Sequence, residues 1–362
     1  MPGEIPGSFF QIEQSVALPD HRCQTVADYW KSVHEMRRLA RSQLAYLLLT
    51  ALVWAQSFVA TPLNDLGAGK YKGFQGGLYE KGSNTVPSGH NSDGLALAAE
   101  VKPVRGKFVL LGIGMSNAAM EFSTFALMAG GDNRVNHTSM VVINGAQGAM
   151  TACGWTTAKE SPQQHGCNMP RFVPNQYDRI RDEQLKPAGL SEDQVEVIWM
   201  KNADPRPSVA LPSKDAEAYQ YERYIGETAR AVRSRYPNLK LMFLTSRIYA
   251  GYASVPLNPE PYAYEYGFAV QWAIRAQVDQ MRTGTIDPVA DNLDYKKSIA
   301  PWMAWGPYIW ADGTTPRSDG LMWDRSEFMP DGTHPNVKGR EKVAHVLIDF
   351  FLNSPYTTWF KK

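Results

Sequence analysis

Residues 107–117 read KFVLLGIGMSN, a short apolar run that ends in a glycine-rich turn and leads into a helical pattern. The run has no polar face, which is typical of a strand buried on both sides of a parallel sheet. The same strand signal returns three times, and stretches with helical spacing separate the runs. The other predicted strands are 139–144, 195–200 and 239–245, and the predicted helices are 117–129, 215–236, 264–282 and 336–352. This alternation predicts an α/β protein whose mainly parallel sheet is covered by helices on both faces, with reactive residues after the carboxyl ends of the strands.

The composition excludes several classes of protein. Hydrophobic residues make up 44% of the 362 residues and charged residues 20%, so the chain has the material for a packed core and is not a disordered protein. Lys and Arg number 37 against 36 Asp and Glu, so the chain lacks the basic excess with which proteins bind nucleic acid or anionic membranes. Three cysteines are too few for a disulfide scaffold or a structural zinc array. A globular enzyme fits these numbers best.

A secretory signal is predicted inside the N-terminal region. A cluster of three arginines over 37–41 precedes the apolar run 44–55, which ends in Val53-Trp54-Ala55. Basic, apolar and cleavable segments in this order form a signal peptide, and the run is shorter than the ~20 residues of a membrane span. A buried helix and a single-pass anchor that continues to Ala60 are the alternatives.

A signal peptide works only at the start of a chain, so translation is expected to begin at Met36. Residues 1–35 are then an over-extended N-terminus, 36–55 the signal peptide, 56–105 an N-terminal arm and 106–362 one α/β domain. Without Cys23 the chain keeps an even pair of cysteines, as exported proteins prefer. The predicted location is secreted or periplasmic.

The turn after the first strand permits two interpretations. A dinucleotide-binding fingerprint needs a third glycine where Asn117 stands, and no acidic residue closes the next strand, which ends at Asn144. A serine nucleophile fits better, because Gly114 permits a tight turn and Ser116 then lies at a helix N-terminus that favours an oxyanion. A plain N-cap role for Ser116 is the alternative.

A second motif favours the nucleophile. Asp331 and His334 stand three residues apart in the stretch 331–335, DGTHP, directly before the last predicted helix. A nucleophilic serine needs a base, and the base needs a carboxylate that orients it. Pro335 suits the first position of the following helix and would hold the turn rigid. An Asx-turn that merely starts a helix is the alternative.

Together these motifs resemble the SGNH (GDSL-like) hydrolase superfamily of esterases, lipases, thioesterases and carbohydrate deacetylases. Its nucleophile block G-D-S corresponds to Gly114-Met115-Ser116, and its D-x-x-H block to Asp331 and His334. Its second block provides a glycine after the second strand, where Gly148 stands. The resemblance covers about 105–352 and implies a flavodoxin-like three-layer α/β/α sandwich, so that 106–362 is an SGNH hydrolase domain.

The resemblance also implies an oxyanion hole, formed by the Ser116 and Gly148 N–H groups and by an asparagine in a third block, G-x-N-D. Here that block reads KNAD over 201–204, without its glycine, so either Asn202 or Asp204 takes the asparagine's place. We expect Asn202, because an Asp is a poor donor unless protonated. Met115 replaces the usual Asp of the first block, a residue that mainly organises the turn.

The softer signals concern cysteines, aromatic residues and isolated histidines. Cys153 and Cys167 are expected to form a disulfide; with His137 and His165 they could instead bind a metal, although no strong zinc pattern matches. The segment 301–323 is rich in tryptophan, and its rings either stack on sugars or pack a long loop. Tyr262, Tyr264 and Tyr266 are expected to pack a helix entry, His90 to lie at the surface and His345 on a helix face.

The resemblance implies a serine esterase that hydrolyses carboxylic esters without a cofactor or metal, with O-acylated carbohydrates ahead of lipids. In this reading Ser116 attacks, His334 transfers the proton and Asp331 orients His334. The expected partner is a small-molecule or carbohydrate ester, with no nucleic acid and no membrane beyond export. A non-catalytic exported module that binds glycans on the same fold is the alternative.

Overall fold

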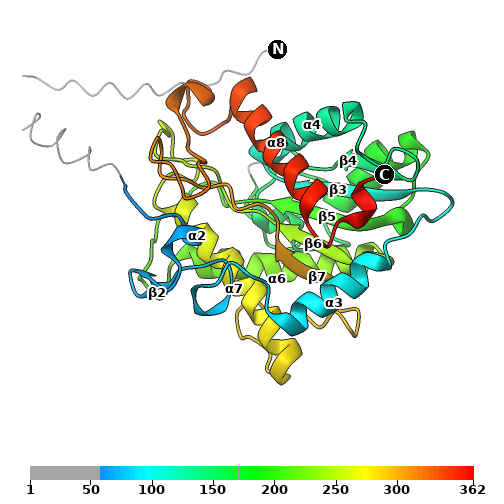
Figure 1. The fold of residues 1–362 in the computed structure, drawn as a ribbon, viewed down its shortest axis with the longest axis horizontal. Coiled ribbons are helices and arrows are strands. Elements are labelled where there is room, and N and C mark those ends of the chain that lie inside the picture. Colours follow the sequence, from blue (N-terminus) through cyan, green and yellow to red (C-terminus); the bar gives the residue numbers. More distant parts are fainter. Residues whose placement is uncertain (1–57, 170) are drawn as a thin grey trace, which may run out of the picture. The chain divides into compact units, whose positions relative to one another are not determined.

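The computed structural model describes residues 58–169 and 171–362, and its centre is a five-stranded parallel sheet (Figure 1). The strands lie in the order β4-β3-β5-β6-β7. Their bounds are β3 Phe108–Gly114, β4 Met140–Asn144, β5 Val195–Lys201, β6 Leu241–Leu244 and β7 Trp302–Trp305. All residues of β3, β5, β6 and β7 are buried, which is why these strands are apolar runs and not alternating ones.

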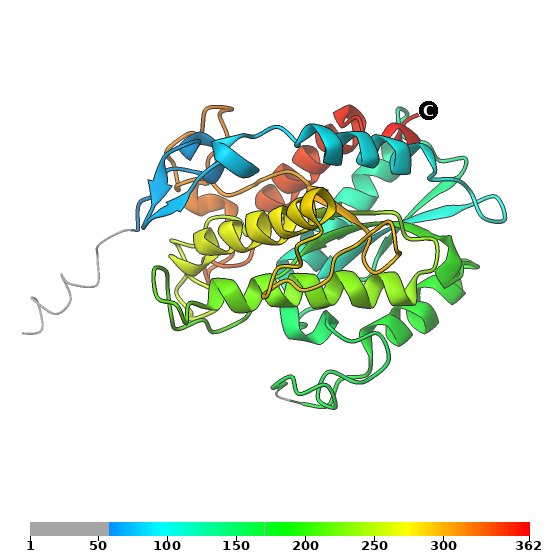
Figure 2. The same cartoon turned by 90° about the horizontal axis from the view of Figure 1, so that it is seen from below.

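Helices cover both faces of the sheet and complete a three-layer α/β/α sandwich. On one face α4 (Ser116–Gly131) packs against α8 (Val337–Asn353), and on the other α6 (Glu217–Arg235) packs against α7 (Tyr262–Thr283) (Figure 2). The strand order is the flavodoxin-like one, in which the first strand of the sheet lies between the second and the third. The predicted fold class is confirmed, and all eight predicted elements are present with slightly shifted ends.

Residues 58–362 form one compact unit, and the arm before β3 belongs to it. The arm contains α2 (Leu63–Leu66), the hairpin β1 (Lys70–Tyr71) and β2 (Phe74–Gln75), η1 (Glu80–Gly82) and α3 (Ser88–Ala99). Gln271 on α7 fastens the hairpin, because its Nε2 donates to the carbonyls of Gln75, Gly76 and Gly77 at 2.6–3.3 Å. The expected over-extended N-terminus and signal peptide lie outside the described residues.

Short helical turns connect the main elements. After β4 the chain forms four of them before a fifth leads into β5, and two more lie near the C-terminus. They are η2 (Ala152–Trp155), α5 (Gln176–Arg179), the π-helical η3 (Ile180–Leu185), η4 (Lys186–Ala188), η5 (Glu192–Gln194), η6 (Arg325–Glu327) and η7 (Thr358–Phe360).

The tryptophan-rich segment 301–323 is part of the core, so a sugar-stacking role for it is wrong. Trp302 and Trp305 lie in β7, the edge strand that the sequence pattern did not reveal. Trp310 and Trp323 are completely buried, and Tyr308 is 5% exposed. Trp302 packs on His90 of α3 and Trp310 on Tyr264 of α7, and the polar N–H groups of the four tryptophans donate to backbone carbonyls or to Glu260.

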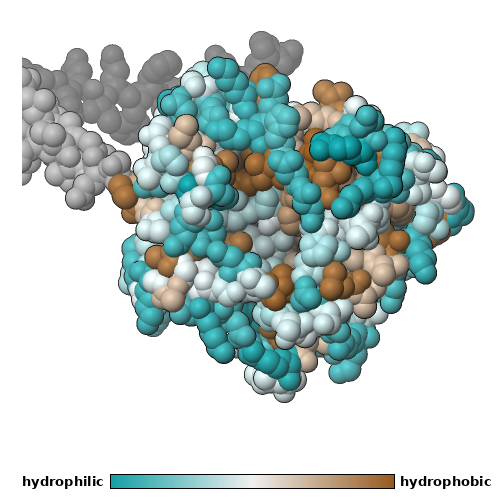
Figure 3. Space-filling model, in the orientation of Figure 1, coloured by the Kyte–Doolittle hydropathy of each residue, from teal (hydrophilic) through white to brown (hydrophobic). Residues whose placement is uncertain are grey.

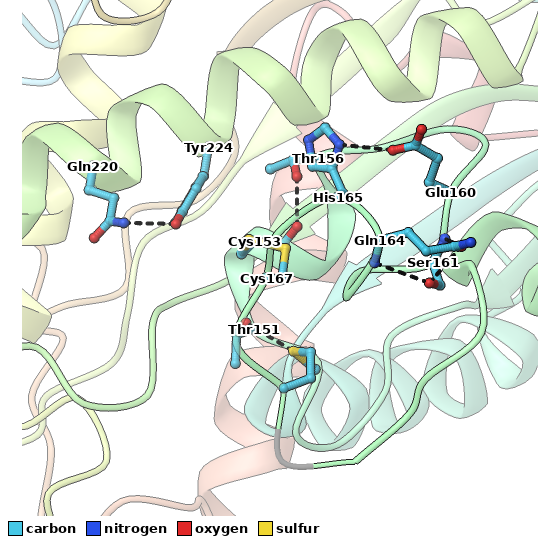
Figure 4. The surroundings of a disulfide bond; sticks show 11 residues. Thr151, Cys153, Thr156, Glu160, Ser161, Gln164, His165, Cys167, Gln220 and Tyr224 are labelled. Carbon is cyan, nitrogen blue, oxygen red and sulfur yellow. Dashed lines mark hydrogen bonds and ion pairs between the residues drawn. A yellow bond between two sulfur atoms is a disulfide. The ribbon is translucent and has the colours of Figure 1, made fainter.

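Cys153 and Cys167 are bonded to each other, as expected (Figure 4). The bond closes a loop with a sequence separation of 14 residues. Within and beside this loop the Thr156 hydroxyl donates to the Cys153 carbonyl at 2.7 Å, and the His165 ring faces the Glu160 carboxylate at 3.4 Å. Since both sulfurs are used, the alternative in which the cysteines bind a metal is wrong.

The disulfide is expected to stabilise the fold. By the chain-entropy model a loop of this length contributes about 3 kcal/mol, so replacing both Cys153 and Cys167 by Ser should lower the free energy of unfolding by roughly 2–3 kcal/mol. Urea denaturation measures the change. A reducing agent should produce the same drop in the wild-type protein and none in the double variant. An equal effect of the reducing agent on both proteins would contradict this origin of the stability.

The described surface shows no broad apolar face in the view of Figure 3, where hydrophobic side chains form small separate patches among hydrophilic ones. The most exposed large apolar side chains, Leu127, Phe172 and Val59, lie far apart in the sequence. None of the helices described in 58–362 is both long and apolar enough to span a bilayer.

Candidate active site

Ser116 is the first residue of α4, and only Met115 separates it from the end of β3. The turn requires glycine at position 114, where φ is +147° and a Cβ atom would lie 1.9 Å from the Lys201 carbonyl oxygen. The serine therefore stands at the carboxyl edge of the sheet. The first N–H groups of a helix have no partners within the helix, and the helix dipole favours negative charge there.

The other end of the site is the turn 331–334, which precedes α8. Within it Asp331 Oδ1 accepts the backbone N–H groups of Thr333 at 3.0 Å and of His334 at 3.1 Å. The prediction that Pro335 opens the last helix is wrong, because α8 begins at Val337 and Asn336 caps it. Pro335 instead forms a β-bridge with Phe328, which holds the turn from the other side.

The structure brings Ser116, His334 and Asp331 into one chain of hydrogen bonds. Ser116 Oγ lies 2.9 Å from His334 Nε2, although the two residues are 218 positions apart. His334 Nδ1 lies 2.5 Å from Asp331 Oδ2. With the ring proton on Nδ1, His334 donates to the carboxylate, and its Nε2 accepts the serine O–H.

The environment of Asp331 keeps its carboxyl group ionised. Partial burial by itself raises the pKa of Asp331, but hydrogen bonds from the His334 ring and from the backbone N–H groups of His334 and Thr333 outweigh it. The pKa of Asp331 is therefore below its ordinary value. An ionised carboxylate at this place orients the imidazole and stabilises its protonated form.

Asn117 connects the turn of Ser116 with the turn of His334, a contact the sequence did not reveal. Its side chain is 2% exposed, and its Nδ2 donates to the Thr333 carbonyl at 3.1 Å. The residue after the serine is thereby bonded to the residue before the histidine. The sequence carries no signal for this contact, because the burial of Asn117 follows only from the fold.

Asn202 has a free amide donor directly after β5, the strand that pairs with β3. The side chain is 3% exposed, its Oδ1 accepts the Ala203 N–H at 2.8 Å, and Tyr221 donates to its backbone carbonyl at 2.8 Å. Among the described residues its Nδ2 has no partner. Buried donors are nearly always paired, so a free one at the carboxyl end of β5 suits an oxygen that arrives with a ligand.

Asp204 is the competing residue of the third block. Burial, and to a lesser extent the charge of Glu217, raises the pKa of Asp204 to about 7. The Asp204 carboxyl forms no hydrogen bond with a described side chain, while its backbone carbonyl accepts from Asn258 at 3.2 Å. At neutral pH the Asn202 amide therefore always offers an N–H donor, whereas the Asp204 carboxyl carries its proton in only part of the molecules.

Gly148 lies in the exposed turn after β4. Two backbone hydrogen bonds join this turn to the end of β3, from Gly145 to the Gly112 carbonyl at 2.8 Å and from Gln147 to the Gly114 carbonyl at 3.0 Å. The Gly148 N–H donates to no described residue. Its place in an oxyanion hole stays a prediction.

Asn202→Ala and Asp204→Ala are expected to differ. Loss of one oxyanion donor lowers kcat by ~10²–10³-fold, so Asn202→Ala should show a loss of this size. Asp204→Ala should be milder, because its carboxyl group donates only in part. Steady-state kinetics on a chromogenic ester compares the two, with circular dichroism to check folding. The reverse order would assign the third-block role to Asp204.

A buried ion pair lies behind the site, and the sequence did not predict it. Lys201 and Glu121 are 1% and 0% exposed, and Lys201 Nζ lies 2.5 and 2.6 Å from the two carboxylate oxygens. Burial raises the pKa of Glu121 and lowers that of Lys201 to about 8. Because Lys201 precedes Asn202 and Glu121 lies on α4, the pair fastens the strand of the free amide to the helix of the serine.

The isolated histidines lie outside this site. His90 is buried, so the expectation of a surface residue is wrong; its ring stacks on Trp302 at 4.8 Å, and burial lowers the pKa of His90 to about 4. His345 is exposed on α8, as expected. Tyr264 and Tyr266 are buried at the start of α7. In the part of the chain that the structure describes, no group of three or more His, Cys, Asp or Glu side chains is placed to bind a metal.

Comparison with known proteins gives structural likenesses only. No protein-family model matches the chain, and no curated protein does. Among solved structures, a gut microbial diltiazem-metabolizing enzyme is 13% identical with a TM-score of 0.34; the match covers 68% of this chain and 47% of that one, so the chain spans about half its length. A GDSL-like lipase from Bacteroides thetaiotaomicron is 11% identical with a TM-score of 0.33, over 73% of this chain and 96% of that one.

At these identities and TM-scores the likenesses carry no argument about the site. What is said of the site rests on the strand order and on the distances within it. The strand order, the serine turn after β3 and the D-x-x-H turn before α8 are the features described above. In its fold the chain is similar to the SGNH (GDSL-like) hydrolases.

Proposed function

We propose that the protein is a serine esterase that hydrolyses carboxylic esters through Ser116, His334 and Asp331. The observation that carries the proposal is the hydrogen-bond chain from Ser116 Oγ to His334 Nε2 and from His334 Nδ1 to Asp331, at 2.9 and 2.5 Å. A serine at a helix N-terminus, a base within reach and a carboxylate behind the base are the parts that acyl transfer needs.

In the first half of the reaction Ser116 Oγ attacks the ester carbonyl carbon while His334 Nε2 takes the hydroxyl proton. The carbonyl oxygen becomes an oxyanion, which the Ser116 and Gly148 N–H groups and the Asn202 Nδ2 stabilise. The carbon–oxygen bond to the alcohol then breaks, and His334 returns the proton to the leaving alcohol.

In the second half water attacks the acyl-serine ester. His334 takes a proton from the water, the tetrahedral intermediate forms again, and its collapse releases the acid and restores the Ser116 hydroxyl. Asp331 stays ionised throughout and stabilises the imidazolium that forms twice. Neither a metal nor a cofactor takes part in any step.

The ester panel that tests this proposal contains p-nitrophenyl acetate, butyrate and octanoate together with acetylated sugars. The rings of 301–323 are buried and cannot stack on a sugar, so nothing favours O-acylated carbohydrates over simple esters. The panel therefore contains both kinds of substrate. We expect hydrolysis of at least one substrate by the chain from Gln56 onward. A folded protein that hydrolyses no member would contradict the proposal and would favour a non-catalytic glycan-binding module.

We also propose that the protein is secreted or periplasmic. The basic and apolar segments after Met36 support export, and a disulfide between Cys153 and Cys167 suits an oxidising compartment. Export with cleavage close to Ala55 gives a mature chain that starts near Gln56. N-terminal sequencing of the native protein tests this, and an intact 1–35 segment would contradict it.

A further inference from the structure

A cavity of about 770 Å³ lies apart from the catalytic residues, none of which lines it. Its walls come from α6, from α7, from the β1–β2 hairpin with the residues that follow it, and from the segment after α7. Figure 2 shows α6 and α7 side by side, with the hairpin beside α7. The volume is within the range of sites that bind small molecules.

Three aromatic side chains form one wall of the cavity, one from the hairpin and one from each helix. Trp272 lies between the others, with ring centroids 4.9 Å from Tyr219 in a stacked pair and 5.3 Å from Phe74. Trp272 is 7% exposed, whereas Phe74 and Tyr219 are only half-buried. The wall offers flat apolar surface to a ligand without exposing the core.

Glu222 is a buried carboxyl group without a partner in this wall. It lies one helical turn from Tyr219, it is 4% exposed, and it forms no hydrogen bond or ion pair with a described residue. Burial, and to a lesser extent the charge of Asp287, raises the pKa of Glu222 to about 8. A protonated carboxyl both donates and accepts, and the Glu222 carboxyl, which lines the cavity and has no protein partner, is placed to pair with a ligand there.

The cavity is lined by charged groups of both signs, three basic and four acidic, and two of the acidic ones, Glu80 and Asp279, are paired with Arg282. The other five are Lys70, Lys81, Arg275, Glu222 and Asp287, and none of them forms an ion pair with a described side chain. The three basic groups would repel a strongly cationic ligand, and the carboxylates would repel an anionic one. A neutral ligand with many hydroxyl groups satisfies donors and acceptors alike, since each hydroxyl is both.

We propose that this cavity binds a neutral saccharide. The apolar face of a sugar ring packs on the wall of Phe74, Tyr219 and Trp272, and ring hydroxyls pair with Glu222 and Arg275. This binding site is separate from Ser116, and the proposal holds whether or not the chain is an esterase.

The experiment is isothermal titration calorimetry on the full chain with Ser116→Ala, so that nothing is turned over. The probes are cellotriose, xylotriose, mannotriose and triacetylchitotriose. We expect at least one to bind and Tyr219→Ala to weaken that binding by about tenfold, the effect of one aromatic contact. Tyr224→Ala is the matched control, because Tyr224 lies on the same helix, is half-buried and does not line the cavity.

Glu222→Leu separates a ligand contact from a structural one. Replacing a buried unpaired carboxyl by an apolar side chain of similar size should leave the melting temperature unchanged or raise it at pH 8, while saccharide binding falls by tenfold or more. Binding equal to that of the parent in both Tyr219→Ala and Glu222→Leu would overturn the proposal. So would a failure of all four trisaccharides to bind. Esterase activity has no part in these outcomes, so each hypothesis can fail separately.

Discussion

Ser116→Ala and His334→Ala are each expected to lower kcat by about 10⁴-fold or more, and the double variant should be hardly worse than either single one. The reason is the direct contact between Ser116 Oγ and His334 Nε2, which makes both residues parts of one proton transfer. Once the nucleophile is absent, the loss of its base costs little more. Initial rates on the best substrate of the ester panel measure all three variants.

Asp331→Ala is expected to lower kcat less than Ser116→Ala or His334→Ala does. The imidazole of His334 remains, but without the carboxylate it is held only by its other contacts. Ser116 is the first residue of α4, and its side chain forms no capping hydrogen bond, so Ser116→Ala should change the free energy of unfolding by less than about 1 kcal/mol. Thermal denaturation serves as the control. Activity within tenfold of the wild type in a folded Ser116→Ala protein would end the esterase account.

Lys201→Met is expected to lower the free energy of unfolding by about 3 kcal/mol. The substitution leaves the fully buried Glu121 carboxyl without its ion-pair partner, and breaking such a pair typically costs 3–5 kcal/mol. The lower end applies here because the positive charge of buried Arg247 also acts on Glu121. Urea denaturation at pH 7 measures the loss.

The double variant Lys201→Met with Glu121→Leu should recover part of that stability, because it removes the orphaned carboxylate but leaves buried Arg247 without the charge of Glu121. Lys186→Met is the matched control: Lys186 forms an ion pair with Asp182 at 2.7 Å, but both side chains are exposed, and its loss should change stability little. If Lys201→Met were as mild as this control, or if the double variant were the least stable of the three, the buried pair would not hold β5 to α4 as described.

The predictable parts of the fold are the elements that a local sequence pattern identifies, such as an apolar run, helical spacing or a turn glycine. The apolar run of β3 and the amphipathic pattern of α8 identify their elements, and Gly114 before Ser116 marks the nucleophile turn. The contact between Ser116 and His334 was predictable for another reason. Parallel strands bring their carboxyl ends to one edge, and the chemistry of a serine nucleophile requires a base there.

The rest depends on partners that are distant in the sequence. In the sequence Trp302 and Trp305 look like part of an aromatic loop. Only their pairing with β6 in the folded sheet shows that they belong to a strand. His90 stands alone in the sequence and finds Trp302 only through folding, at a separation of 212 residues. Nothing local identifies Glu121 as the partner of Lys201, because the choice between surface and burial for a charged residue is made by the tertiary structure.

The most direct test of the central claim is labelling with a fluorophosphonate, which forms a covalent bond only with an activated serine. Peptide mass spectrometry of the labelled protein identifies the modified residue, and His334→Ala serves as a folded variant without the base. The account predicts a single adduct on Ser116 that forms at least a hundredfold more slowly in His334→Ala, since general-base assistance contributes roughly 10²–10⁴-fold. An unlabelled Ser116 in folded protein, or equal labelling of Ser116 in His334→Ala, would contradict it.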